Sequence, residues 1–124
     1  MQRNRPKNLN LISIRLPINA LVSILHRISG TILFLILPFL IFSLQLSLKS
    51  LDGYKQLADL TSSHFIKLIL IVLAWSFFHH FFAGIRHLAM DIHWMTSLQK
   101  ARLSGRVVLL LGAIAVVIFT IIIW

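Results

Sequence analysis

Three long apolar segments divide the chain, at about residues 21–48, 64–90 and 107–124. Each holds at least about 18 mostly apolar residues, close to the roughly 20 that a helix needs to cross about 30 Å of hydrocarbon. Only helices or closed barrels satisfy their own backbone polar groups in lipid. The pattern therefore predicts an all-α membrane protein. Residues 1–124 would form a single transmembrane domain with helices at about 21–48, 64–91 and 105–124.

Breaks in the apolar pattern predict how these helices begin and how they are joined. Pro17 suits the first turn of the first helix, where its missing N–H has no partner to lose. Pro38 should kink the same helix inside the bilayer. Residues 49–63 contain an Asp-Gly pair and predict a loop, with a short interfacial helix at about 54–60. The first apolar core is too long for a cleavable signal, and no small-residue cleavage site follows it.

The composition supports a membrane protein and excludes several functions. Of the 124 residues, 58% are hydrophobic and 12% are charged, about half the charged fraction of a soluble domain. The formal net charge is +9. However, the basic residues flank the apolar runs and are not interleaved with aromatic residues, so we expect no nucleic-acid binding. The chain has no cysteine, which excludes disulfides, thiolate-bound metals and iron–sulfur ligation within it.

The basic residues also predict the orientation of the helices. Nine of the 12 fall on one side of the predicted membrane: Arg3, Arg5, Lys7, Arg15, Arg27, Arg86, Lys100, Arg102 and Arg106. The other three fall on the opposite side: Lys49, Lys55 and Lys67. Positive residues are enriched in cytoplasmic loops. We therefore expect a cytoplasmic amino terminus, with the last helix ending at the far face.

Two groups of polar residues fall inside the predicted helices, where ionisable side chains are costly and usually face the bundle interior. The first helix has four at the i, i+3, i+4, i+7 spacing of a single face: Ser23, His26, Arg27 and Gly30. The second helix also has four on one face: His80, Gly84, His87 and Asp91. Because the helices are antiparallel, both faces lie in the cytoplasmic half. At roughly 16 Å from Asp91, His80 is near the middle of the membrane.

This arrangement suits a haem b. An imidazole can bind haem iron, and the small residues Ala83 and Gly84 would let a porphyrin lie flat against the second helix. His26, Arg27 and His87 lie nearer the cytoplasm, where they would pair with the haem propionates. The third apolar segment has neither histidine nor methionine. A second axial ligand would therefore come from a partner chain.

Alternatives remain open on the residues alone. His79 stands beside His80, so the pattern does not decide which imidazole would bind iron. A single histidine in a membrane helix can also be a hydrogen-bonding residue of the bundle. Arg27 and Arg86 could simply extend to the lipid head groups.

Two longer motifs resemble those of the cytochrome b membrane-anchor subunits of succinate dehydrogenase. The amino-terminal one comprises NRP at residues 4–6, IRLP at 14–17 and SILHRISG at 23–30. The second is HFFAGIRHLAMD at residues 80–91. Both stand in the order and at the spacing typical of that family, and the three-helix layout agrees. The resemblance covers essentially the whole chain.

The resemblance implies that the three helices form half of a heterodimeric helical bundle around haem b. A second hydrophobic anchor subunit would supply the other half and the second axial ligand. Both anchors would dock under a flavoprotein and an iron–sulfur subunit in a bacterial inner membrane, with the carboxyl end of this chain periplasmic. Succinate would be oxidised at the flavin, outside this chain. Electrons would then pass through iron–sulfur clusters to ubiquinone.

The resemblance also assigns roles to residues. The haem ligand of the family, four positions before Gly-Ile-Arg-His, corresponds to His80. The residues of the quinone pocket correspond to Ser23 and Arg27, with Asp91 close to the quinone end. The residues near the haem propionates correspond to His26 and His87, with Arg27 beside them.

The chemistry of quinone reduction fits these residues. The reaction takes two electrons and two protons, so the quinone oxygens need hydrogen-bond donors. Ser23 could donate to one carbonyl, Arg27 could stabilise negative charge, and Asp91 could take part in proton supply. The expected function is a haem- and quinone-binding anchor of succinate:quinone oxidoreductase. The alternatives are a fumarate reductase anchor and a non-enzymatic membrane assembly protein.

Overall fold

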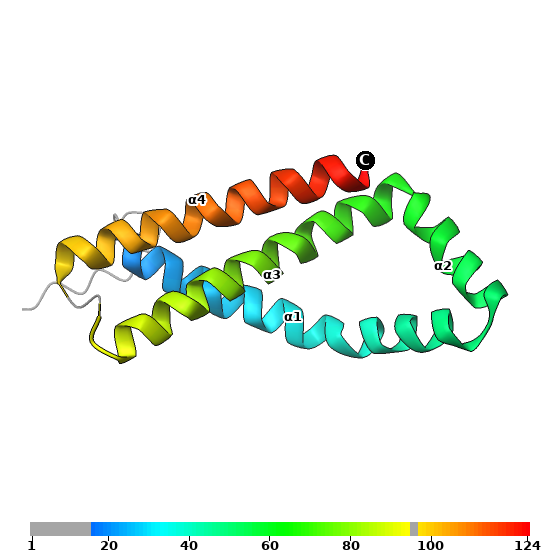
Figure 1. Ribbon diagram of the computed structural model, residues 1–124, viewed down its shortest axis with the longest axis horizontal. Coiled ribbons are helices and arrows are strands. Elements are labelled where there is room, and N and C mark those ends of the chain that lie inside the picture. The colour runs from blue at the N-terminus through cyan, green and yellow to red at the C-terminus, as the bar shows by residue number, and fades with distance from the viewer. Residues whose placement is uncertain (1–15, 95–96) are drawn as a thin grey trace, which may run out of the picture.

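The structure is a computed structural model that describes residues 16–94 and 97–124. Within these residues the chain forms helices and no strands: α1 (Ile18–Lys49), α2 (Leu51–Ser62), α3 (His64–Asp91) and α4 (Leu98–Ile123) (Figure 1). Three of these, α1, α3 and α4, are long and apolar enough to cross a membrane. The prediction of an all-α membrane protein with three spanning helices is confirmed.

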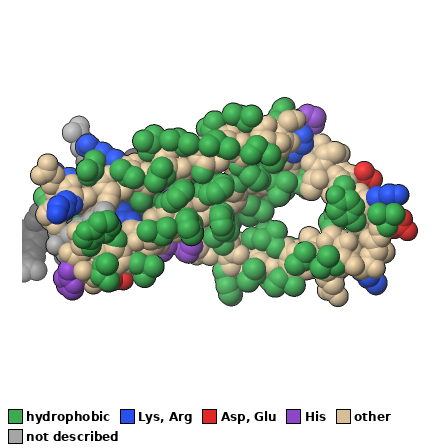
Figure 2. All heavy atoms as spheres, viewed as in Figure 1, with side chains coloured by type: hydrophobic (Ala, Val, Ile, Leu, Met, Phe, Trp, Pro, Cys, Tyr) green, Lys and Arg blue, Asp and Glu red, His purple; other side chains and the backbone are tan. Residues whose placement is uncertain are grey.

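The spanning helices run up, down and up. The start of α1, the end of α3 and the start of α4 lie at one end of the bundle, and α2 lies at the other (Figure 1). We call the first the basic end, because α4 begins there with Lys100, Arg102 and Arg106. The helices α1 and α3 diverge toward α2, and Figure 2 shows the opening between them. The second half of α1 therefore exposes large apolar side chains, including Phe34, Phe39 and Phe42.

The helices extend beyond the apolar segments that predicted them. Pro17 is the residue before α1, with extended backbone, so the helix begins at Ile18, earlier than residue 21. The short helix expected at about 54–60 is present, but it is longer: α2 takes up most of the predicted loop at 49–63. The Ser50 side chain accepts a hydrogen bond from the Gly53 amide at 3.0 Å, and Asp52 lies in the first turn of α2. Both features stabilise a helix amino terminus.

The start of α4 differs most from the expectation of a helix at about residue 105. The helix begins at Leu98, and the Ser97 hydroxyl accepts from the Lys100 amide at 3.4 Å as its cap. Hydropathy detects only the segment that can enter the hydrocarbon. Lysine, arginine and leucine all favour a helix, so α4 continues beyond that segment into its basic first turns.

Small residues allow the three helices to approach each other. Val22 of α1, Ala83 of α3 and Val108 of α4 form the buried apolar core. A Cβ atom added at Gly105 would lie 3.3 Å from the Asn19 Oδ1 atom, and one at Gly112 would lie 3.9 Å from the His79 Cα atom. Such close backbone approach is typical of helix packing in membranes, where apolar burial gives little driving force.

Arg86 joins all three spanning helices and is only 4% exposed. Its Nε atom donates to the Ser104 hydroxyl at 3.0 Å. Its Nη2 atom donates to the Asn19 side-chain oxygen at 3.0 Å and to the Ala101 carbonyl at 3.2 Å. Arg86 therefore does not extend to the lipid head groups, and that interpretation of this arginine is wrong.

Replacing Arg86 by leucine should destabilise the bundle by about 2 kcal/mol, because hydrogen bonds between membrane helices contribute roughly 0.6 kcal/mol each and three are lost. The measurement is denaturation of the purified protein in detergent or nanodiscs. Arg102→Leu is the matched control, because Arg102 is exposed at the same end and its loss should change stability by less than about 0.5 kcal/mol. Equal stability of the two variants would contradict the role of Arg86.

Candidate functional site

Three histidines gather between α1 and α3, and we call them the histidine cluster: His26, His80 and His87. The rings of His26 and His80 are stacked, with centroids 4.2 Å apart and planes 11° apart. The His87 ring lies 5.0 Å from that of His26 at an angle of 51°. All three residues are half-buried. The structure thus brings together side chains from the two polar faces that the spacing predicted.

The His80 ring is oriented by the backbone of α1. Its Nδ1 atom lies 3.2 Å from the main-chain oxygen of His26. A carbonyl can only accept, so the Nδ1 atom of His80 is the donor, and in the neutral imidazole the lone pair is then on Nε2. Metal-binding histidines usually donate their other ring N–H to such a partner, which fixes the tautomer.

Glycine makes room for the His80 ring. A Cβ atom added at Gly30 would lie 2.8 Å from the His80 Cε1 atom and 3.1 Å from its Nδ1 atom. An alanine there would push the ring from its position. Gly84 has a smaller effect, because a Cβ atom there would lie 3.7 Å from the His26 Nε2 atom, an ordinary contact distance.

One polar atom of the cluster is buried without a partner. The Nε2 atom of His26 has no hydrogen-bond partner among the described residues. Leaving a buried polar group unsatisfied costs roughly 1–3 kcal/mol. A bound group that brings an acceptor or a donor to His26 would remove this cost.

His79 lies in a different environment from its neighbour His80. It is 1% exposed and its ring stacks on Trp75, with centroids 5.6 Å apart. Its backbone lies beside Gly112 of α4. His79 is therefore enclosed by its own chain, whereas His80 lies on a half-exposed face.

The predicted quinone-site residues lie near the cluster but do not meet one another. Ser23 is half-buried on α1, while Arg27 and Asp91 are exposed. Within residues 16–94 and 97–124, no hydrogen bond joins any of these side chains to another. Their side chains are therefore available to a ligand or a partner subunit that covers this face of the helices.

The cluster is not arranged as a site for a bare metal ion. In the described part of the chain no three histidine or acidic side chains are placed to hold one. Two of the rings are stacked face to face, so their nitrogen atoms do not converge on a single point. A group that needs only one imidazole from this chain suits the geometry better.

Sequence reasoning missed the polar contacts on the other side of α3. Asn19 and Ser104 were not singled out, although both bond to Arg86. One signal was present in the spacing: Arg86 follows His79 by seven residues and Ala83 by three, which places it on the buried face of α3.

The fold and the site define a class of protein: a membrane protein with three spanning helices and an imidazole cluster on a half-exposed face. Comparison with known proteins makes this specific. The model of the succinate dehydrogenase/fumarate reductase transmembrane subunit family matches residues 1–119. The chain therefore belongs to this family, as a succinate dehydrogenase cytochrome b anchor subunit, and the resemblance seen in the motifs is confirmed.

The relatives agree over most or all of the chain. The succinate dehydrogenase cytochrome b556 subunit of Coxiella burnetii is 37% identical over the full length of both chains. The cytochrome b556 subunit of Rickettsia prowazekii is 36% identical over 82% of this chain and 78% of its own. The cytochrome b560 subunit of Reclinomonas americana is 32% identical over 100% of this chain and 87% of its own.

Proposed function

We propose that this chain binds haem b and ubiquinone as the membrane anchor of a succinate:quinone oxidoreductase. The observation that carries the proposal is the geometry of His80. Its Nδ1 atom donates to the His26 carbonyl, its ring fills the space left by Gly30, and its face is half-exposed. The relatives are named as cytochromes b of succinate dehydrogenase, which supports a haem b for this chain as well.

The residues present fit a haem b. His80 would hold the haem iron through its Nε2 atom, and the partner anchor would supply a second ligand. His26, whose Nε2 atom is buried without a partner, would donate to a propionate, and His87 and Arg27 would share that role. When bound, haem b would accept and release one electron. His79 fits poorly, because it is enclosed by its own chain.

The quinone would bind beside Ser23, Arg27 and Asp91, whose side chains are available to a ligand. The Ser23 hydroxyl would donate to one quinone carbonyl, and the Arg27 guanidinium would stabilise negative charge on the quinone oxygens. The exposed Asp91 carboxyl group would hold and deliver a proton. These side chains do not meet within this chain, so partner subunits would complete the pocket.

The partners would be a second hydrophobic anchor, an iron–sulfur subunit and a flavoprotein, and succinate would be oxidised on the flavoprotein. The exposed apolar side chains of α1 give the second anchor a surface in the lipid. Of the eight basic residues that the structure describes, five lie toward the basic end: Arg27, Arg86, Lys100, Arg102 and Arg106. This supports a cytoplasmic basic end and a periplasmic α2 in a bacterial inner membrane. The same site could serve fumarate reduction with the direction reversed.

Isolation of the complex through an affinity tag on this chain tests the proposal. We expect an iron–sulfur protein, a flavoprotein and a second small hydrophobic subunit to co-purify. We also expect about one haem b per copy of this chain, because it supplies a single axial histidine. The measurements are mass spectrometry of the subunits and the reduced-minus-oxidised absorbance spectrum. A complex with all four subunits and no haem would contradict haem binding.

A further inference from the structure

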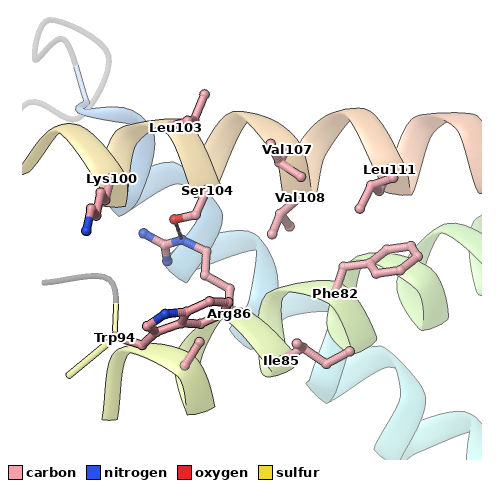
Figure 3. A pocket seen from close by; sticks show the side chains of 11 residues that line it. Phe82, Ile85, Arg86, Trp94, Lys100, Leu103, Ser104, Val107, Val108 and Leu111 are labelled. Atoms are coloured by element: carbon pink, nitrogen blue, oxygen red, sulfur yellow. Dashed lines mark hydrogen bonds between the residues drawn. The ribbon is translucent and has the colours of Figure 1, made fainter. Parts of the chain in front are cut away.

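A groove of about 420 Å³ opens between α3 and α4 near the basic end (Figure 3). Its walls are mostly apolar, with Phe82 and Ile85 from α3 and Val107 and Leu111 from α4. Its polar members lie at one end: Arg86, Lys100, Ser104 and the ring of Trp94. The groove therefore has an apolar length and a positively charged end.

This groove is separate from the histidine cluster. An α-helix turns 100° per residue, so Phe82, Ile85 and Ala89 project from the side of α3 opposite to His80 and His87. A ligand in the groove would therefore not contact the residues proposed to hold haem or quinone. Ligand binding in the groove is thus independent of the proposed haem and quinone sites.

The turn that ends α3 places Trp94 at the mouth of the groove. His93 takes the left-handed conformation, with φ 60. The Trp94 amide donates to the Ala89 carbonyl at 3.1 Å and the His93 amide to the Met90 carbonyl at 3.0 Å, which together form a Schellman motif. The chain folds back so that Ala89 and Trp94 both line the groove. Tryptophan prefers the boundary between lipid and water, so this end of the groove suits that depth.

The positive charge at the mouth has few carboxylates to neutralise it. The whole chain has three acidic residues: Asp52, Asp59 and Asp91. The first two are in α2, at the far end of the bundle (Figure 2). Asp91 projects from α3 on the side of the histidine cluster. Figure 3 shows the Lys100 amine and the Arg86 guanidinium facing the same space.

We propose that the groove binds an anionic phospholipid, with one acyl chain along its apolar walls and the phosphate at Lys100. Basic pockets between membrane helices on the cytoplasmic side suit such head groups. The volume is in the range of small-molecule sites, roughly 300–1,000 Å³. Arg86 and Ser104 already bond to each other and to the Ala101 carbonyl, so the charge of Lys100 is left to attract the phosphate.

Lipid binding to the delipidated, intact complex tests this proposal, measured by native mass spectrometry with phosphatidylglycerol and with phosphatidylcholine. We expect phosphatidylglycerol to bind more tightly. Lys100→Gln should weaken its binding about fivefold, from the loss of roughly one surface charge, and leave phosphatidylcholine unchanged. Val107→Trp fills the groove without changing charge and should weaken both lipids. Lys55→Gln, at the far end on α2, is the matched control and should weaken neither.

Four results would overturn the proposal. Equal binding of the two lipids, or binding insensitive to both Lys100→Gln and Val107→Trp, would remove the lipid from this groove. Displacement of phosphatidylglycerol by added ubiquinone would assign the groove to quinone. A photoreactive residue at position 107 that crosslinks to another subunit would show that protein fills it. The haem spectrum should stay unchanged in all three variants, which separates this test from that of the proposed function.

Discussion

Complexes that carry His80→Ala should lose most of the reduced α-band of haem b, with haem content falling about tenfold or more. The variant removes the imidazole that we assign to the iron, and weakening even the hydrogen bond behind such a ligand commonly costs 10–100-fold in metal affinity. The measurement is the reduced-minus-oxidised spectrum of the purified complex. A His80→Gly variant should recover part of the band when imidazole is added, because the free ligand can occupy the space left by the side chain.

His79→Gln is the matched control for this experiment. It also replaces a histidine of α3, at the neighbouring position, but that side chain is enclosed by its own chain and should not reach the haem. The glutamine approximately preserves the volume, so the band should remain nearly intact. If His79→Gln loses the band and His80→Ala keeps it, the ligand assignment is wrong by one residue.

Membranes with Arg27→Leu should lose about 100-fold in succinate:ubiquinone activity, and those with Ser23→Ala about tenfold. Removing one preorganised donor to a developing oxyanion typically costs 10²–10³ in rate, and a charged donor contributes more than a hydroxyl. Reduction of a soluble dye by succinate should be unchanged, because that path ends before the membrane. The two rates measured on the same membranes separate quinone chemistry from succinate chemistry.

The serine variant is the cleaner of the two. Arg27 is also a proposed propionate partner, so its loss can disturb the haem as well as the quinone. Ser47→Ala is the control for Ser23→Ala. It makes the same change on α1 at the far end, where the hydroxyl donates to the Leu44 carbonyl of its own helix, and both activities should persist. Loss of the dye activity together with the quinone activity would mean that Ser23 and Arg27 hold the complex together and do not serve the quinone.

The spanning helices could be predicted because a helix needs roughly 20 apolar residues to cross the hydrocarbon of a bilayer. Their ends could not be predicted in the same way. The first turns of α4 contain Lys100 and Arg102, which hydropathy rejects but helix propensity accepts. The helix α2 depends on the Ser50 cap, a local hydrogen bond that an apolar pattern does not contain.

The site was predictable as far as helical spacing determines which side chains share a face. That spacing placed His26, His80 and His87 on facing sides, and they meet in the structure. It could not separate His79 from His80, because adjacent residues differ by only 100° around the helix and burial depends on where α4 packs. It also could not reveal the three-helix contacts of Arg86, which need the tertiary structure.

The relative positions of Ser23, Arg27 and Asp91 could not be predicted from this sequence alone. A pocket formed between subunits is specified by several sequences, and one chain contributes only part of its wall. Resemblance to the motifs of the family assigned roles in quinone binding to these residues. In the structure their side chains do not bond to one another. Their roles in quinone binding stay predictions that a complex must test.

Depletion of this chain from cells, followed by assay of both succinate activities in separated membrane and soluble fractions, tests the central claim most directly. If the chain anchors a succinate:quinone oxidoreductase and contributes its quinone site, membranes should lose succinate:ubiquinone activity. Succinate-to-dye activity should then move to the soluble fraction with the released flavoprotein and iron–sulfur subunits, and the haem b band should disappear from the membranes. Undiminished succinate:ubiquinone activity in membranes without the chain would contradict the account.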